Sequence, residues 1–203
     1  MLNVLQIPPG ELFALLAAIG FAAGLNLYAT VAVLGLLARF GHLPLPPGLQ
    51  LLESWPIIAA STALFAVEFF ADKIPAFDLI WNALHTFVRV PVAGLLAFQA
   101  TRQLSPGMQL LATLLGAAVA FAAHGGKTAT RAAVTPSPEP FSNITLSLSE
   151  DALAIGLTWL ATQHPYIAGT LATMFVVIIL LLMRWVIRAL GALFRGAEHE
   201  LAG

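Results

Sequence analysis

The sequence predicts an all-α integral membrane protein. We expect about six transmembrane helices in two three-helix inverted repeats, each beginning with a broken or re-entrant helix. Only 9% of the 203 residues are charged and 59% are apolar, with a mean hydropathy of +0.89, whereas soluble domains carry about 25% charged residues. In addition, the stretches FAAGLNLYAT at 21–30 and FAAHGGKTAT at 121–130 are nearly copies of each other.

Composition also excludes some classes of function. A net charge of −1 argues against nucleic acid as a partner. The chain has no cysteine, so disulfides and thiol chemistry are excluded. The first residues, MLNVLQIPPGE, lack the basic region and cleavage site of a secretory signal. We therefore expect one membrane domain over residues 1–203, with the lipid bilayer as its surroundings.

Six apolar segments follow one another along the chain: 11–40, about 55–72, 77–102, 108–135, about 146–163 and 166 to about 194. A bilayer core of about 30 Å needs about 20 helical residues, so the second and fifth segments match one crossing each. The first and fourth are longer, and glycine-containing polar interruptions divide them at 24–26 and 124–126. Backbone groups released at a break cannot face lipid, so we expect both breaks to be buried or to line a cavity.

These segments divide into repeat one, about 10–103, and repeat two, about 107–196. Three crossings per half would insert the second half upside down; re-entrant breaks would instead make the halves parallel. Arg184, Arg188 and Arg195 lie near the end of the last segment. The positive-inside rule then predicts a cytoplasmic C-terminus, and six crossings would place the N-terminus there too.

The second interruption is the densest polar cluster in the sequence. Its candidate substrate-binding residues are His124, Gly125, Gly126, Lys127, Thr128 and Arg131. A half-helix beginning near Lys127 would direct its positive dipole end at the break, and Arg131 would add charge on the same face. This pattern indicates binding of a carboxylate, phosphate or lipid headgroup. Alternatively, Lys127 neutralises Glu68 and the glycines allow close helix packing.

The first interruption offers neutral groups. Asn26 and Tyr28 could hydrogen-bond a solute from the side opposite the cationic cluster, or could satisfy only the backbone of the broken helix.

A polar stripe follows one face of the third segment. Asp78, Asn82, His85 and Arg89 recur at intervals of four, three and four residues. Such a stripe should face the bundle interior or a wet cavity. The alternatives are an interfacial helix among lipid headgroups, or a stripe that only joins neighbouring helices.

Two acids lie at the end of the second segment. Glu68 follows a nearly apolar run, so it lies within the hydrocarbon layer, either paired or able to carry a coupled proton. The paired alternative is a salt bridge to Lys127, Arg89 or Arg131. Asp72 also belongs to this polar path and, with Lys73, marks the water interface.

Other patterns favour structural roles. Ser149, Glu150 and Asp151 are typical of a helix N-cap followed by acids that complement the helix dipole. No catalytic motif or metal-ligand spacing is present, so we expect no cofactor, no metal and no enzymatic activity.

The motifs GLNLYAT at 24–30, EFFADKIPAFDLIWNALHTFVRVP at 68–91, HGGKTATR at 124–131 and SPEPFSN at 137–143 resemble a bacterial integral-membrane family known as a domain of unknown function. The resemblance extends from the first to the fifth segment. It implies no activity.

The sequence thus predicts a small inner-membrane transporter of an anionic solute, coupled to protons through Glu68 or the polar stripe. An alternative is a flippase or scramblase of an anionic lipid, which re-entrant hairpins or a groove open to lipid would favour. A second alternative is a membrane-embedded enzyme or structural subunit. Abundant alanine and glycine faces are compatible with a homodimer.

Overall fold

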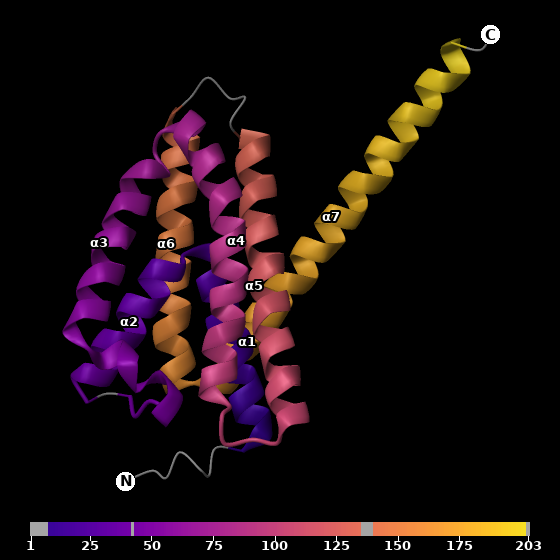
Figure 1. Ribbon diagram of the computed structural model, residues 1–203. Coiled ribbons are helices and arrows are strands. Elements are labelled where there is room, and N and C mark those ends of the chain that lie inside the picture. Colours follow the sequence, from indigo (N-terminus) through magenta and orange to yellow (C-terminus); the bar gives the residue numbers. More distant parts are fainter. Residues whose placement is uncertain (1–7, 42, 135–139, 202–203) are drawn as a thin grey trace.

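The computed structural model describes residues 8–41, 43–134 and 140–201; the side chains of 75–79, 132–134, 140 and 189–201 lie outside this description. The described chain is a helical bundle without strands (Figure 1). Its elements, in order, are α1 Pro9–Leu25, α2 Leu27–Arg39, the 3-10 helix η2 Pro47–Glu53, α3 Trp55–Ala71, α4 Pro75–Ala100, α5 Pro106–Val134, α6 Pro140–Gln163 and α7 Pro165–Leu201.

Proline and glycine set the helix limits. α1, α4, α5, α6 and α7 each begin at a proline, a residue suited to the first helical turn because the missing N–H has no partner there. α2 is followed by Gly41, whose φ of +77° is the left-handed conformation that closes many helices. The six predicted apolar segments match these elements, with the first divided into α1 and α2.

The first predicted interruption is present and forms a helical hairpin. At Asn26 the backbone becomes extended, with φ −147° and ψ 101°, and the side chain accepts a hydrogen bond from the amide of Ala29, which caps α2. α2 then returns toward the end of the bundle at which α1 begins (Figure 1). The first break is therefore a turn at which α2 folds back toward the start of α1, with Asn26 fully buried at its tip.

The second predicted interruption is absent, and that prediction was wrong. α5 continues without a break from Pro106 to Val134, through Gly125 and Gly126. Glycine costs a helix only about 1 kcal/mol relative to alanine, so packing can retain it. A Cβ at Gly126 would lie 2.7 Å from the side chain of Ile179, which shows that α5 and α7 approach closely at this glycine. The alternative in which the glycines serve helix packing therefore accounts for Gly126.

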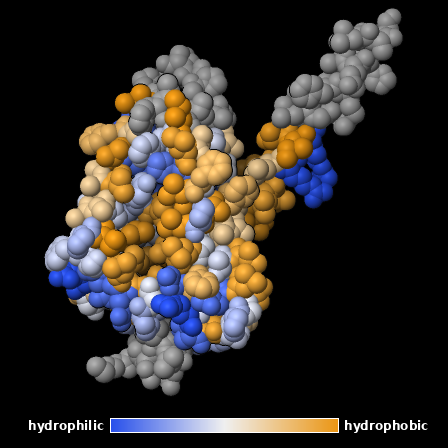
Figure 2. All heavy atoms as spheres, in the orientation of Figure 1, coloured by the Kyte–Doolittle hydropathy of each residue, from blue (hydrophilic) through white to orange (hydrophobic). Residues whose placement is uncertain are grey.

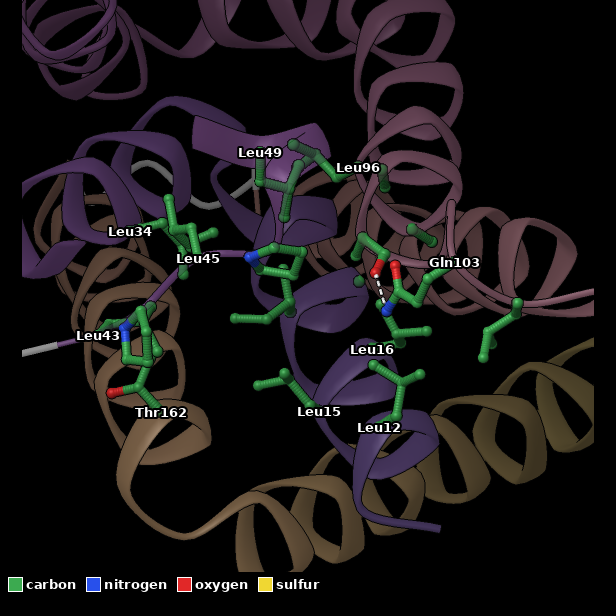
Figure 3. A pocket seen from close by; sticks show the side chains of 18 residues that line it. Leu12, Leu15, Leu16, Leu34, Leu43, Leu45, Leu49, Leu96, Gln103 and Thr162 are labelled. Carbon is green, nitrogen blue, oxygen red and sulfur yellow. Dashed lines mark hydrogen bonds between the residues drawn. The ribbon is translucent and has the colours of Figure 1, made fainter. Parts of the chain in front are cut away.

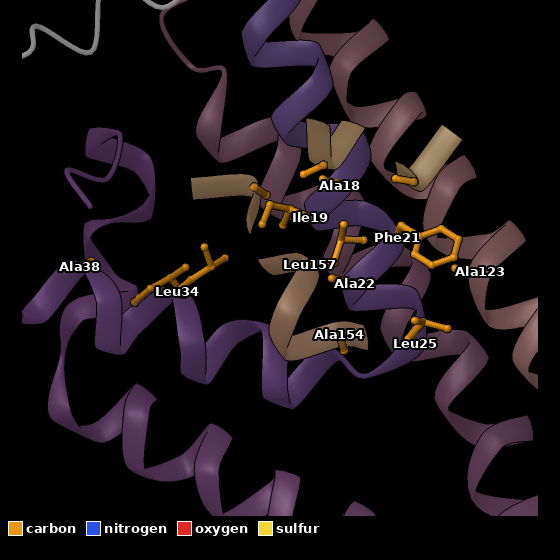
Figure 4. Packing of buried hydrophobic residues seen from close by; sticks show 14 of the residues in the cluster. Ala18, Ile19, Phe21, Ala22, Leu25, Leu34, Ala38, Ala123, Ala154 and Leu157 are labelled. Atoms are coloured by element: carbon orange, nitrogen blue, oxygen red, sulfur yellow. The ribbon is translucent and has the colours of Figure 1, made fainter. Parts of the chain in front are cut away.

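Small residues bring α1 and α5 together at the centre of the bundle. A Cβ at Gly20 would lie 2.9 Å from the carbonyl oxygen of Gly116, and one at Gly24 would lie 2.9 Å from the Cα of Ala120. The contacts advance in the same direction on both helices, so α1 and α5 run parallel. Side chains from α1, α2, α5 and α6 complete the core around them (Figure 4). Helices packed through small residues are typical of membrane bundles.

The outside of the bundle is apolar. Phe87, Leu181 and Trp185 are among many large hydrophobic side chains that are mostly exposed. On the face in Figure 2, hydrophobic residues cover most of the middle of the bundle and hydrophilic residues gather at its lower end. By length and composition, four of the described helices could cross a membrane: 80–100, 106–131, 141–163 and 165–188. A fifth is the bent pair of η2 and α3. This is consistent with a multi-pass membrane protein; the six predicted crossings are not confirmed.

The helix directions define two ends of the bundle. α1 and α7 begin side by side, since Gly10 lies near Tyr166 and Gly169 near Ala14. We call this the lower end and the opposite one, where α3 and α5 end, the upper end, as in Figure 1. The start of α1 and the end of α7 therefore lie at opposite ends of the molecule.

Candidate functional site

Charged side chains gather inside the upper half of the bundle. We call them the ionic cluster: Glu68, Asp72, Arg89, Lys127, Arg131 and Glu150. They come from α3 and its C-cap, α4, α5 and α6, and all are buried. Because an unpaired buried charge is costly, each must be held by a partner of opposite sign.

Lys127 on α5 lies at the centre of the cluster. Its Nζ is 2.9 Å from Asp72 Oδ2, 3.4 Å from Glu150 Oε2 and 3.5 Å from Glu68 Oε1. It also donates to the carbonyl oxygen of Leu25, 3.3 Å away. That carbonyl belongs to the last residue of α1, where helix carbonyls lack a partner. Lys127 therefore joins acids of α3, its C-cap and α6, and it anchors the hairpin tip.

Arg131 lies one turn further along α5 and contacts two acids. Its Nη2 and Nε atoms reach the carboxylate of Glu150, at 2.5 and 3.3 Å. Nη2 is also 3.2 Å from Asp72 Oδ2, while Nη1 donates to the Asp72 carbonyl at 2.9 Å. The fork geometry suits arginine rather than lysine at this position.

Arg89 on α4 pairs with Glu68 and fixes the state of a histidine. Its Nη2 donates to Glu68 Oε1, and its Nη1 contacts Asn82 Oδ1 at 3.3 Å and His124 Nδ1 at 3.0 Å. Arginine can only donate, so His124 Nδ1 accepts. His124 Nε2–H is then the donor to the Asn82 carbonyl, 3.1 Å away, and to Thr86 at 2.8 Å. This arrangement holds His124 neutral.

The stripe on α4 reaches the hairpin through His85. Its Nδ1–H donates to the Trp81 carbonyl at 2.8 Å, which leaves Nε2 to accept from the Tyr28 hydroxyl at 2.9 Å. The Trp81 ring stacks on the imidazole, with centroids 4.2 Å apart. His85 is thus a neutral link between α4 and α2.

Two titratable groups lie just beyond α3. Burial alone would raise the pKa of Asp72, but Lys127, Arg131 and Arg89 outweigh it and hold that pKa below its ordinary value. Burial lowers the pKa of the Lys73 ammonium, with Asp151 and Asp72 opposing the shift. Asp72 is completely buried within the ionic cluster.

The structure brings most of the predicted site residues together. Those in the cluster or in contact with it are Glu68, Asp72, Asn82, Arg89, His124, Lys127 and Arg131. Asn26, Tyr28 and His85 form hydrogen bonds outside the cluster, from Asn26 to Asp151 and between Tyr28 and His85. Gly125 and Gly126 lie within a regular helix, and the buried hydroxyl of Thr128 has no hydrogen-bond partner. Asp78 lies outside the residues whose side chains the structure describes.

Sequence reasoning missed the contribution of α6. Glu150 and Asp151 were interpreted as acids of a helix start, and this was wrong because α6 begins ten residues earlier, at Pro140. Asn143 also belongs to the site, since Arg131 Nη1 is 3.4 Å from its Oδ1. A signal was present in the sequence: the polar residues Asn143, Ser147 and Glu150 recur at intervals of four and three. In the structure they lie on the buried face of α6.

Asp151 lies beside the cluster and binds the hairpin tip. Its Oδ1 accepts a hydrogen bond of 2.8 Å from Asn26 Nδ2. Within the described residues, no group of three His, Asp or Glu side chains is arranged to hold a metal ion. The site therefore consists of ion pairs and neutral hydrogen bonds around the hairpin tip.

The lower half of the bundle contains an apolar cavity of about 130 Å³. Leucines of α1 (Leu12, Leu15 and Leu16) and Leu34 of α2 line it, with residues 43–46 and the ends of α4 and α6 closing it (Figure 3). The polar side chains in its lining are Gln103 and Thr162. The interior is therefore charged toward the upper end and apolar toward the lower one.

Fold and site together define a class: a helical bundle with several membrane-length apolar helices and a buried cluster of ion pairs around a helical hairpin. A protein-family model described as "Domain of unknown function (DUF4126)" matches residues 13–185, and the chain belongs to this family. No curated protein and no solved structure matches the chain. The predicted resemblance to a domain of unknown function is thereby confirmed.

Proposed function

We propose that the protein is a small, proton-coupled membrane transporter of an anionic solute. One observation carries this proposal: three buried cations, Arg89, Lys127 and Arg131, lie inside a bundle with an apolar exterior, and Lys127 contacts the tip of the helical hairpin. Intramembrane ionisable groups are expensive and usually mark the path of an ion or substrate.

In the conformation described, the protein's own carboxylates occupy the cations. An incoming carboxylate or phosphate would replace Asp72 or Glu150 at Lys127 and Arg131, because its anionic oxygens can accept the same hydrogen bonds. The exchange adds negative charge to a buried site. Uptake of a proton with the anion would keep the total charge unchanged, so anion binding should strengthen as the pH falls.

The same proposal includes the membrane placement. We place the protein in the bacterial inner membrane with Arg184 and Arg188 on the cytoplasmic side, following the positive-inside rule. Because α1 begins at the opposite end of the bundle, the start of α1 then faces the other side, in place of the cytoplasmic N-terminus expected from six crossings.

We also propose that the halves are divergent inverted repeats. α3 and α6 run in opposite directions, as do α4 and α7 (Figure 1), which supports inversion. In an inverted repeat, α1 would run opposite to α5. Because α1 instead runs parallel to α5, we propose that α1 is the part of repeat one that has folded back.

Binding can be tested with purified full-length protein and two probes, inorganic phosphate and succinate. The proposal expects one probe to raise the unfolding midpoint, and to do so more strongly at lower pH. Lys127→Gln should abolish this shift. Arg39→Gln should preserve it, because the Arg39 side chain contacts Trp55 and the Glu53 carbonyl, outside the cluster.

The outcome decides between the classes of function. Proteoliposomes that accumulate the bound probe under a proton gradient would establish transport. Binding of neither probe at any pH would contradict the proposal and favour a structural subunit whose charges only hold the helices together.

A lipid-handling function is the second candidate, because α1 and α2 form a hairpin at the first break and residues of both helices line an apolar cavity. If the protein handles lipid, the anionic group bound by the cations is a lipid phosphate, and the cavity accepts part of an acyl chain. Vesicles containing fluorescent phosphatidylglycerol distinguish the two. Protein-dependent movement of this lipid between leaflets, lost in Lys127→Gln, would favour lipid handling over solute transport.

A further inference from the structure

Asp151 is the one buried acid in the described upper half that has no ion-pair partner. Four buried carboxylates, Glu68, Asp72, Glu150 and Asp151, face three buried cations. The first three acids each lie within 3.5 Å of a lysine or arginine nitrogen. Asp151 instead accepts one hydrogen bond from Asn26, and its Oδ2 has no hydrogen-bond partner.

The other buried titratable groups are poor proton carriers in this arrangement. Glu68, the sequence-based candidate, is bound by Arg89 and Lys127, so its charge is already balanced. His124 and His85 each use one ring nitrogen as donor and the other as acceptor. A second proton on either imidazole would break the bond at the accepting nitrogen.

The surroundings of Asp151 favour a proton rather than a metal ion. Lys127 on α5 attracts a charged Asp151, whereas Asp72 and Glu68 on the α3 side repel it. Lys73 also acts on this carboxylate from the connection between α3 and α4, and Glu150 precedes it on α6. Within the described residues, the acids are not arranged to hold a metal ion. A proton on Oδ2 removes the surplus charge and leaves Oδ1 free to accept from Asn26.

We propose that Asp151 is the site that takes up and releases the coupled proton, and that Asn26 links its charge to the tip of the α1–α2 hairpin. This inference rests on the proposed function, because it names the proton site of that transporter. The charge balance is simple. An anion at Lys127 and Arg131 adds one negative charge, and the proton on Asp151 removes one.

The link to the hairpin follows from the two roles of Asn26. Its Oδ1 caps α2 by accepting from Ala29 N, while its Nδ2 donates to Asp151. A carboxylate is a stronger acceptor than a neutral acid, so deprotonation tightens the bond to the tip. Protonation loosens it, in the state that also admits the anion. Asn26 is thus a positioning residue through which proton binding and hairpin movement are joined.

The proton site can be observed without any solute. Purified full-length protein in lipid nanodiscs would be titrated with acid while infrared difference spectroscopy follows the C=O band of protonated carboxyl groups. We expect one such band from a buried acid, lost in Asp151→Asn and retained in Glu53→Gln, an acid of η2 at the lower end. Asn26→Ala should keep the band but shift its frequency, because the Nδ2–H donor is gone.

A second set of measurements tests whether anion binding is coupled to proton uptake. In Asp151→Asn, phosphate or succinate should still raise the unfolding midpoint, but the effect should no longer depend on pH. Asp151→Glu, which keeps a carboxyl group, should retain the pH dependence and give a band at a changed frequency. It serves as the test if Asp151→Asn does not fold, because a band left unchanged in Asp151→Glu would belong to another acid.

The results separate the two proposals. A wild-type band that persists unchanged in Asp151→Asn, or no titrating band at all, overturns the assignment of Asp151, even if anions bind. A band that disappears with Asp151 while no anion binds at any pH leaves the proton site in place and overturns the transporter.

Discussion

Lys127 Nζ lies 2.9 Å from Asp72 Oδ2, and this ion pair joins α5 in the second half of the chain to the end of α3 in the first. Both side chains are fully buried. The pair is therefore a structural tie between the halves as well as part of the candidate site.

Removing the cation should be strongly destabilising. Lys127→Met leaves Asp72, Glu68 and Glu150 with fewer positive partners in a buried site, and breaking a buried pair costs about 3–5 kcal/mol. We expect a lower unfolding midpoint in detergent. The double variant Lys127→Met with Asp72→Asn should lose less than the sum of the two single variants, because the interaction is shared. Strict additivity would contradict the pairing.

The glycines of α1 and α5 should respond in opposite ways to alanine. A Cβ at Gly24 would lie 2.8 Å from the Cβ of Ala123 and 2.9 Å from the Cα of Ala120. Gly24→Ala must push the helices apart and should cost about 1–3 kcal/mol.

Gly125→Ala is the matched control, since no atom lies within 4 Å of its Cβ position. It should be neutral or should stabilise the helix by up to about 1 kcal/mol. Unfolding measurements on both variants test the packing of α1 on α5. Equal destabilisation by the two substitutions would contradict a continuous helix through residues 124–126.

Acid should weaken the fold through Asp72. Its folded-state pKa lies below the unfolded value of about 3.9, so its stabilising contribution is complete above that pH and is lost as the pH falls through the folded pKa. We expect the unfolding midpoint to decrease below about pH 4.

Asp72→Asn should be less stable at neutral pH and should show a flatter dependence in acid, whereas Glu53→Gln should follow the wild type. An unchanged acid slope in Asp72→Asn would show that another group controls this transition.

The hairpin predicts which positions share a side of the membrane. The chain has no cysteine, so single cysteines can be labelled without background. Gly10→Cys and Phe40→Cys should react with an impermeant thiol reagent from the same side, and Ile74→Cys from the other. Labelling of positions 10 and 40 from opposite sides would mean that α1 and α2 together cross the membrane.

Local patterns predicted the helices well, because prolines and apolar runs act over a few residues. The interruption at Asn26 was also predicted correctly, since an Asx residue after glycine suits a helix cap. The same reasoning failed at Gly125–Gly126. There the close approach of Ile179 decides the role of Gly126, and a contact between residues so far apart in sequence leaves no local signal.

The ion pairs illustrate the same limit. Spacing placed Asn82, His85 and Arg89 on one face of a helix, and the salt bridge of Glu68 to Lys127 or Arg89 was among the alternatives. Asp151 was misplaced because the start of α6 was set too late in the sequence. An acid assigned to a helix end is then expected in water, whereas the structure buries it.

The order of the charges along the chain has a consequence for biogenesis. Glu68 and Arg89 belong to the consecutive helices α3 and α4, and Arg131 and Glu150 to α5 and α6. Each of these two pairs of helices can thus leave the ribosome with one ion pair available within it, and can enter lipid with part of its charge balanced. Final assembly then requires only that the two units meet through Lys127 and close around Asn26.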